Sequence, residues 1–184
     1  AQTRIAGMMT GALELTNVVA KDTVDNMTKD PRFAVTAVNG LQYFYMYLDA
    51  AGLSGADMMK KAKVRQAMAH AVNRAAIRDL VIPGGKGGFN LKALCIPFQI
   101  GCASTTKPPA YVPARAKKLL AEAGFPNGFT VDINTLRRSE AVATAVSGDL
   151  LKVGIRTKIK TMTFPAYRKL QRQGKFQVLV HVFG

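Results

Sequence analysis

The sequence predicts an α/β fold with a central sheet, and three patterns in its last third carry this prediction. Segments 130–136 and 155–162 alternate in polarity as strands do, and segment 140–153 between them has helical spacing. A further helix, roughly 165–173, precedes a nearly continuous apolar stretch at 176–183, which is typical of a strand covered on both faces. This β-α-β-α-β order implies parallel strands joined by right-handed crossovers.

The helix over 140–153 has defined ends and one apolar face. We expect Ser139 to cap its start and Gly154 to stop it, because serine accepts bonds from first-turn N–H groups and glycine tolerates left-handed backbone angles. The predicted inward positions share the helical spacing: Val142, Ala145, Val146, Leu150 and Val153.

The N-terminal part predicts two helices and then a hairpin. Segment 1–13 has apolar residues on one helical side, and segment 21–29 is a second, short helix. Segments 32–39 and 42–49 are rich in Val, Phe and Tyr and predict strands. The Asn39-Gly40 pair between them is a strong hairpin signal.

Two helix-and-breaker segments occupy the middle of the chain. In the first, Asn73 is placed to cap a second helix over 74–81. In the other, Pro113 suits a first helical turn and Gly124 a stop. Each segment carries one apolar stripe, formed by Val64, Ala67, Met68, Ala71 and Val72 in the first and by Ala116, Leu119, Leu120 and Ala123 in the second.

Segment 84–112 is a long loop with little periodicity, and it contains both cysteines. Cys95 and Cys102 lie seven positions apart in a region rich in Pro, Gly and Ser. In an oxidising compartment we expect them to form a disulfide that pins the loop. The alternatives are two free thiols or half of a metal site. No metal site is expected, because His70 and His181 lie far away in sequence.

Length and charge predict one domain and leave a nucleic-acid-binding function open. The 184 residues predict a single domain, 1–184. The 26 Lys and Arg residues against 11 Asp and Glu give a net charge of +15, which is typical of proteins with polyanionic partners. The alternative function is therefore a basic nucleic-acid-binding domain. Against it, the cations are spread over most elements and no nucleic-acid-binding motif accompanies them.

No motif for catalysis accompanies these elements, so we expect no enzyme and no cofactor. The run Gly84-Gly85-Lys86-Gly87-Gly88 lacks the Ser or Thr that a phosphate loop requires after its lysine, and a helix precedes it where a strand is needed. Neither cysteine has a histidine nearby in sequence to activate it as a nucleophile.

Five ordered segments resemble motifs of one protein family. They are RIAGMMTGALEL, VRQAMAHAVNR, ARAKKLLAEAGFPNGF, the strand-helix pair that begins at LLKVGIRTKIK, and the terminal FQVLVHVFG. Together they resemble the peptide/nickel family of extracellular solute-binding proteins, family 5, which serve ABC importers. The chain departs from the family pattern at Glu14 and Asn73, where Asp is usual, and at Phe164 and Phe183, where Trp is common.

The resemblance implies one lobe of a class II periplasmic-binding-protein-like fold, with a central mixed sheet flanked by helices. It implies the C-terminal lobe of a bacterial two-lobe receptor, and the absence of an initiator Met fits an excised piece. The implied ligand is a peptide or similar small solute, bound in the cleft between lobes. The implied partner is the ABC permease, and the implied location is periplasmic or extracellular. Membrane contact would then occur only through the transporter or a missing N-terminal anchor.

Four residues are candidates for contact with a ligand. Arg137 and Arg138 follow a strand end, where ligands of open α/β sheets bind, and an arginine there can pair with a peptide carboxylate. His181 and Phe183 lie near the end of the last strand. The alternatives are two solvated arginines and a buried core histidine. The aromatic residues of segment 42–49 are either an aromatic wall or part of the sheet core: Tyr43, Phe44, Tyr45 and Tyr47.

Overall fold

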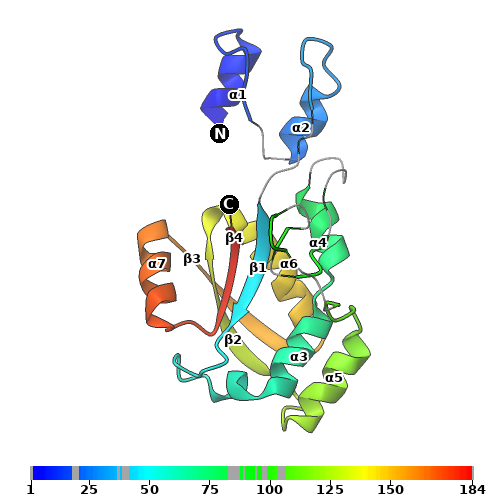
Figure 1. Cartoon of the computed structure of the whole chain (residues 1–184), viewed down its shortest axis with the longest axis vertical. Coiled ribbons are helices and arrows are strands. Elements are labelled where there is room, and N and C mark those ends of the chain that lie inside the picture. Colours follow the sequence, from blue (N-terminus) through cyan, green and yellow to red (C-terminus); the bar gives the residue numbers. More distant parts are fainter. Residues whose placement is uncertain are drawn as a thin grey trace. The chain divides into compact units, whose positions relative to one another are not determined.

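The computed structural model describes residues 2–17, 21–36, 38, 42–82, 88, 90–93, 95–96, 99–102 and 107–183. Its Cα positions group into two compact units (Figure 1). The smaller unit contains residues 1–39 and 78–89, and the larger unit contains residues 40–77 and 90–184. The candidate site lies within the larger unit.

The smaller unit contains two of the predicted helices, α1 (Gln2–Met9) and α2 (Lys21–Met27). The predicted strand at 32–39 is wrong for residues 32–36 and 38, none of which is in a strand. A local turn replaces the start of that strand, because the Asp30 carboxylate accepts hydrogen bonds from both the backbone N–H and the guanidinium of Arg32. The expected hairpin at Asn39-Gly40 lies outside the described residues.

The larger unit is built on a four-stranded mixed sheet in the order β1-β4-β2-β3. The strands are β1 (Tyr43–Leu48), β2 (Phe129–Leu136), β3 (Ile155–Met162) and β4 (Val178–Phe183). Strand β2 runs parallel to both β3 and β4, which confirms the parallel pairing predicted from the β-α-β-α-β order. Strand β1 pairs antiparallel with β4 at the other edge.

The two crossover helices cover opposite faces of this sheet. Helix α6 (Glu140–Leu151) connects β2 to β3, and α7 (Phe164–Gln173) connects β3 back past β2 to β4. Because the two connections move in opposite directions across the sheet, the same right-handed rule places their helices on opposite sides. Figure 1 shows α7 on one side of the strands and α6 and α3 on the other.

The α6 face holds the main apolar core of the larger unit. Its buried members are Val142, Ala143, Val146 and Leu150 from α6 and Val131, Ile133 and Ile155 from the strands. The predicted cap at Ser139 is wrong, since its side chain makes no capping hydrogen bond. A short 3-10 helix, η3 (Arg137–Ser139), intervenes and gives Ser139 backbone angles of φ −111° and ψ 6° instead of the extended angles that a capping serine adopts.

The middle helices form in the predicted places. They are α3 (Ala62–Ala71), α4 (Arg74–Val81) and α5 (Pro113–Glu122), and a short 3-10 helix, η1 (Asp57–Lys60), precedes α3. The Asn73 cap is confirmed, because its Oδ1 accepts a hydrogen bond of 3.1 Å from the Ala76 N–H. The stop at Gly124 is confirmed by its φ of +89°.

Parts of the long loop are held by a disulfide within the loop and by hydrogen bonds to α3. Cys95 and Cys102 form the predicted disulfide, with their Cα atoms 5.6 Å apart. Segment 107–112 is attached to α3 at His70, whose Nδ1 lies 2.7 Å from the carbonyl oxygen of Ala110 and whose carbonyl accepts from the Val112 N–H. Among the helices that the structure describes, none combines the length and apolarity needed to cross a membrane.

Candidate functional site

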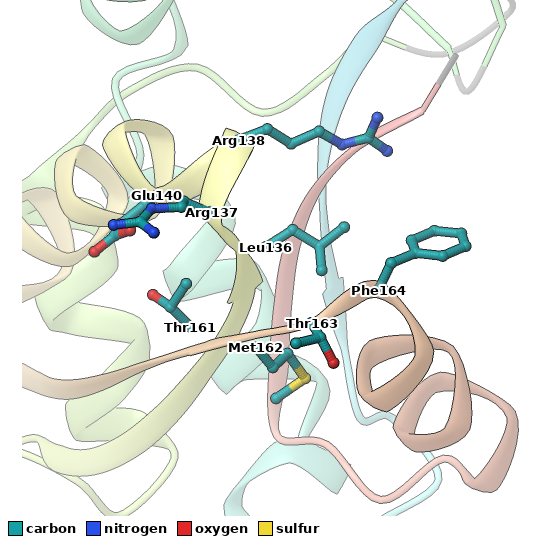
Figure 2. Close-up of a pocket in the computed structure, with 8 residues that line it drawn as sticks. All are labelled: Leu136, Arg137, Arg138, Glu140, Thr161, Met162, Thr163 and Phe164. Atoms are coloured by element: carbon teal, nitrogen blue, oxygen red, sulfur yellow. The ribbon is translucent and has the colours of Figure 1, made fainter. Parts of the chain in front are cut away.

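An open groove of about 1090 Å³ lies at the carboxyl ends of β2 and β3 (Figure 2). Leu136 contributes the last residue of β2, and Met162 the last residue of β3. The groove is also bordered by η3, by the start of α6 and by the start of α7. Its lining residues are Leu136, Arg137, Arg138, Glu140, Thr161, Met162, Thr163 and Phe164. This is the sheet edge at which open α/β folds bind ligands.

The groove combines an apolar floor with a polar rim. Leu136 is buried and Met162 half-buried, and both pack into a small cluster with Tyr167 and Leu179 on the α7 face of the sheet. Phe164 is 55% exposed although it is a large aromatic residue. An exposed ring beside buried apolar side chains offers a surface on which an apolar part of a ligand can pack.

The charges around the groove favour a negatively charged ligand. Two arginines line it, against the single carboxylate of Glu140. Helices α6 and α7 both begin at the groove, so the partial positive charges of their N-termini lie there as well. The arrangement suits an anionic group on the bound molecule.

The two predicted arginines lie in the same groove but point in different directions. In Figure 2, Arg137 turns toward α6 beside Glu140, whereas Arg138 extends toward β4. The Arg138 Nη2 lies 3.3 Å from His181 Nε2 and 3.4 Å from the carbonyl oxygen of Val182. Within the described part of the chain, the Arg137 side chain has no hydrogen-bond or ion-pair partner, so it is available to a ligand.

His181 contacts the groove residue Arg138 from β4 and is only 6% exposed. Its ring centroid is 4.5 Å from that of Tyr167 on α7 and 5.8 Å from that of Tyr45 on β1. It is not among the residues that line the groove. The backbone of Phe183 pairs with Tyr43 at the end of β4, and the side chain of Phe183 lies outside what the structure describes.

Burial shifts the acid-base behaviour of this cluster. Desolvation, with the positive charges of Arg138 and Arg168 in addition, lowers the pKa of His181 to about 4. Desolvation also raises the pKa of Tyr167, and the neighbouring Tyr45 raises it further. At neutral pH the cluster around His181 is therefore uncharged, apart from the arginines beside it.

Sequence reasoning missed the half of the groove contributed by the end of β3. Thr161 and Met162 end an alternating strand and Thr163 follows it, so the rule that ligands bind at carboxyl strand ends indicates all three. In the sequence, Phe164 differs from the Trp that is common in the family, and nothing else there indicates a role in the groove. The tyrosines of β1 line no part of the groove, and Tyr45 instead packs on His181. The described residues hold no cluster of three or more metal-ligating side chains.

Comparison with known proteins gives consistent results along the whole chain. The family model of the bacterial extracellular solute-binding proteins, family 5 Middle, matches residues 1–184. Heme-binding protein A of Haemophilus influenzae is 29% identical, over 100% of this chain and 34% of its own length. The dipeptide-binding protein of Escherichia coli is 33% identical, over 64% of this chain and 23% of its own length. The chain thus spans about a third or less of these relatives.

Solved structures show the same fold. The periplasmic binding protein DppA of Helicobacter pylori, in complex with the peptide STSA, superposes with a TM-score of 0.81 at 25% identity, over 99% of this chain and 35% of that one. HbpA2 of Haemophilus parasuis superposes with a TM-score of 0.74 at 27% identity, over 100% and 36%. The chain therefore belongs to the bacterial extracellular solute-binding proteins of family 5.

Proposed function

We propose that this chain is the C-terminal lobe of a two-lobe ABC-importer receptor, and that residues 1–184 act as one domain within it. The partial coverage of every relative reported above supports a lobe of a larger protein. The lobe binds its solute in the groove at the ends of β2 and β3, without chemical change to the solute. The second lobe closes over that groove, and the ABC permease recognises the closed state.

The bound solute is a peptide or a similar small molecule that carries a carboxylate. The observation that carries this proposal is Arg137, an exposed arginine without a described partner, at the rim of a groove with an apolar floor. A guanidinium can hold a carboxylate through two parallel hydrogen bonds. Relatives named for dipeptide and glutathione binding, and a relative in complex with a peptide, support this solute class.

Arg138 and Phe164 complete the ligand contacts in this proposal. Arg138 adds positive charge at the β4 side of the groove, and Phe164 packs against an apolar side chain of the solute. Phe183 contributes a further contact from the end of β4. His181 contributes indirectly, because it is buried and contacts Arg138.

The receptor works outside the cytoplasm, in the periplasm or at the cell surface. The family consists of extracellular binding proteins, and the disulfide between Cys95 and Cys102 suits an oxidising compartment. A signal peptide upstream of this chain and adjacent permease and ATPase genes would agree with the proposal. A cytoplasmic location of the parent protein in cell fractionation would contradict it.

Calorimetric titration of the complete receptor tests the ligand class. The dipeptide Met-Leu, its C-terminal amide, glutathione and haem serve as probes. We expect Met-Leu or glutathione to bind, and the amide to bind more weakly than Met-Leu, because it lacks the carboxylate that Arg137 pairs with. Equal affinity for Met-Leu and its amide would overturn the proposed role of Arg137. Binding of haem alone would overturn the peptide class.

A further inference from the structure

The side chain of His181 is buried on the α7 face of the sheet, next to the groove residue Arg138. On β4 it lies directly opposite Tyr45 of β1 in the sheet register. Tyr167 of α7 contacts it from above the same sheet face, with the ring centroids 4.5 Å apart. Its Nδ1 is buried and has no hydrogen-bond partner among the described residues. A buried imidazole with one unpaired nitrogen costs stability.

The other nitrogen faces an arginine of the groove. The His181 Nε2 lies 3.3 Å from the Nη2 of Arg138, which comes from η3, 43 residues earlier in the chain. A guanidinium can only donate hydrogen bonds, so Nε2 must accept and the ring proton must be on Nδ1. The same Nη2 also donates to the Val182 carbonyl oxygen at 3.4 Å. Arg137, next to it in sequence, has no comparable contact among the described residues.

We propose that His181 is a positioning residue for Arg138, and that its neutral Nδ1–H form directs the guanidinium to the β4 side of the ligand groove. Both contacts to Arg138 are longer than an ideal hydrogen bond, so they direct the side chain without locking it. The two neighbouring arginines therefore differ in how freely their side chains can move. Arg137 is free to follow the ligand, whereas Arg138 is pre-oriented. This inference deepens the proposed function and rests on it.

The positioning depends on pH, because only a neutral imidazole accepts a hydrogen bond. Arg138 from η3 and Arg168 from α7 are the charges that act on His181, and both are positive. The other titratable groups packed on its ring are the hydroxyls of Tyr45 and Tyr167. With burial, these surroundings keep His181 neutral down to about its lowered pKa of 4. Protonation removes the acceptor and places a third positive charge beside the arginines.

Nitrogen-detected NMR of the labelled 184-residue chain tests the geometry without a ligand. At pH 7 we expect the Nδ1–H tautomer of His181 and a distinct guanidinium signal for Arg138. His181→Gln keeps an acceptor and should keep that signal, whereas His181→Phe keeps the ring size but has no acceptor and should lose it. An Nε2–H tautomer, or an Arg138 signal unchanged in His181→Phe, would overturn the inference. Backbone signals of β2 and β3 report whether each variant folds.

Titration of the complete receptor with Met-Leu and its C-terminal amide tests the effect on ligands. We expect His181→Phe to reduce the preference for Met-Leu over the amide by several-fold and by less than about tenfold, because Arg138 no longer adds its positive charge on the β4 side while Arg137 still pairs with the carboxylate. His181→Gln should retain the preference. If the wild-type receptor binds neither probe, the proposed peptide function fails, while the NMR result on Arg138 still decides the positioning role. An unchanged preference in His181→Phe would contradict that role.

Discussion

The two faces of the central sheet differ in kind, although a crossover helix covers each of them. On the α6 face the buried side chains are mostly aliphatic, and Leu150, Ile133 and Ile155 are fully buried. On the α7 face the largest buried side chain is Tyr167, and it lies against His181. Burying polar groups costs stability unless they find partners. One face is therefore an aliphatic core that supplies stability, whereas the other buries polar rings beside the groove at a cost in stability.

Truncation in the α6 face should have the largest effect. Leu150→Ala removes a fully buried side chain and leaves a cavity, so we expect a loss of about 2 to 5 kcal/mol in the free energy of unfolding. Urea unfolding measures it. The matched control is Leu151→Ala, since Leu151 is 61% exposed and should change stability by less than about 0.5 kcal/mol. Equal losses in the two variants would show that α6 does not pack as described.

Acidification should lower the free energy of unfolding through His181, which is buried on the α7 face. The unfolded chain protonates its histidines near pH 6.5, whereas folded His181 stays neutral until about pH 4, so the unfolded state binds more protons between these values. Stability is therefore fully present above about pH 6.5 and is lost as the pH falls toward 4, by on the order of 2 kcal/mol. Urea unfolding at several pH values measures this loss.

A variant without the imidazole provides the control for this pH effect. His181→Gln should show almost no loss between pH 6.5 and 4.5, while Leu150→Ala should keep the wild-type slope. Asp49 affects stability only at lower pH. Its burial raises its pKa, but hydrogen bonds from the loop that follows it outweigh burial and lower the pKa. If the free energy of unfolding of His181→Gln falls with pH as steeply as that of the wild type, groups other than His181 cause the loss of stability.

A change at the groove rim should affect binding and leave stability alone. Arg137→Gln removes an exposed cation without a described partner, so we expect unfolding to change by less than about 0.5 kcal/mol and Met-Leu affinity to fall about tenfold. Calorimetric titration of the complete receptor measures the affinity. Lys158→Gln removes the same charge from an exposed position of β3 outside the groove, and it should retain affinity. A similar loss in both variants would point to net charge instead of a contact.

The smallest effect is expected at a buried hydroxyl that has no hydrogen-bond partner among the residues that the structure describes. The Oγ of Ser139 is buried without a partner among the described residues, so Ser139→Ala should change the free energy of unfolding by less than about 0.5 kcal/mol. Thr135→Val is the contrast, because the Thr135 Oγ1 donates to the Val180 carbonyl oxygen at 2.9 Å, and its loss should cost about 1 kcal/mol. A larger loss in Ser139→Ala would mean that this hydroxyl caps α6 in solution.

Most elements of the larger unit could be predicted because their signals are local. Alternation over 155–162 and the apolar stretch at 176–183 predicted β3 and β4, and Asn73 predicted the start of α4. The prediction was wrong at segment 32–39, where the Asp30 carboxylate holds Arg32 in a turn. It was also wrong at Ser139, because a 3-10 turn takes the place of the cap. In both places a side-chain or backbone contact outweighed residue propensity.

The candidate site was only half predictable for a different reason. Arg137 and Arg138 were identified from their position after a strand. Nothing local indicated that Arg138 meets His181, 43 residues later, or that Phe164 lies at the same edge as Leu136. Those neighbours depend on which strands lie side by side. The order β1-β4-β2-β3 is a property of the whole sheet, and no short pattern encodes it.

By itself the sequence determined the α/β class, the parallel strands, the pairing of its two cysteines and the family resemblance, because periodicity, helix and turn signals and motif order are written along the chain. Only the tertiary structure decided that α6 and α7 cover opposite faces and that Arg137 and Arg138 point in different directions. It also decided that His181 is buried against Arg138 and does not line the groove. The physical reason is that a side chain's role depends on neighbours brought to it by strand order and crossover handedness.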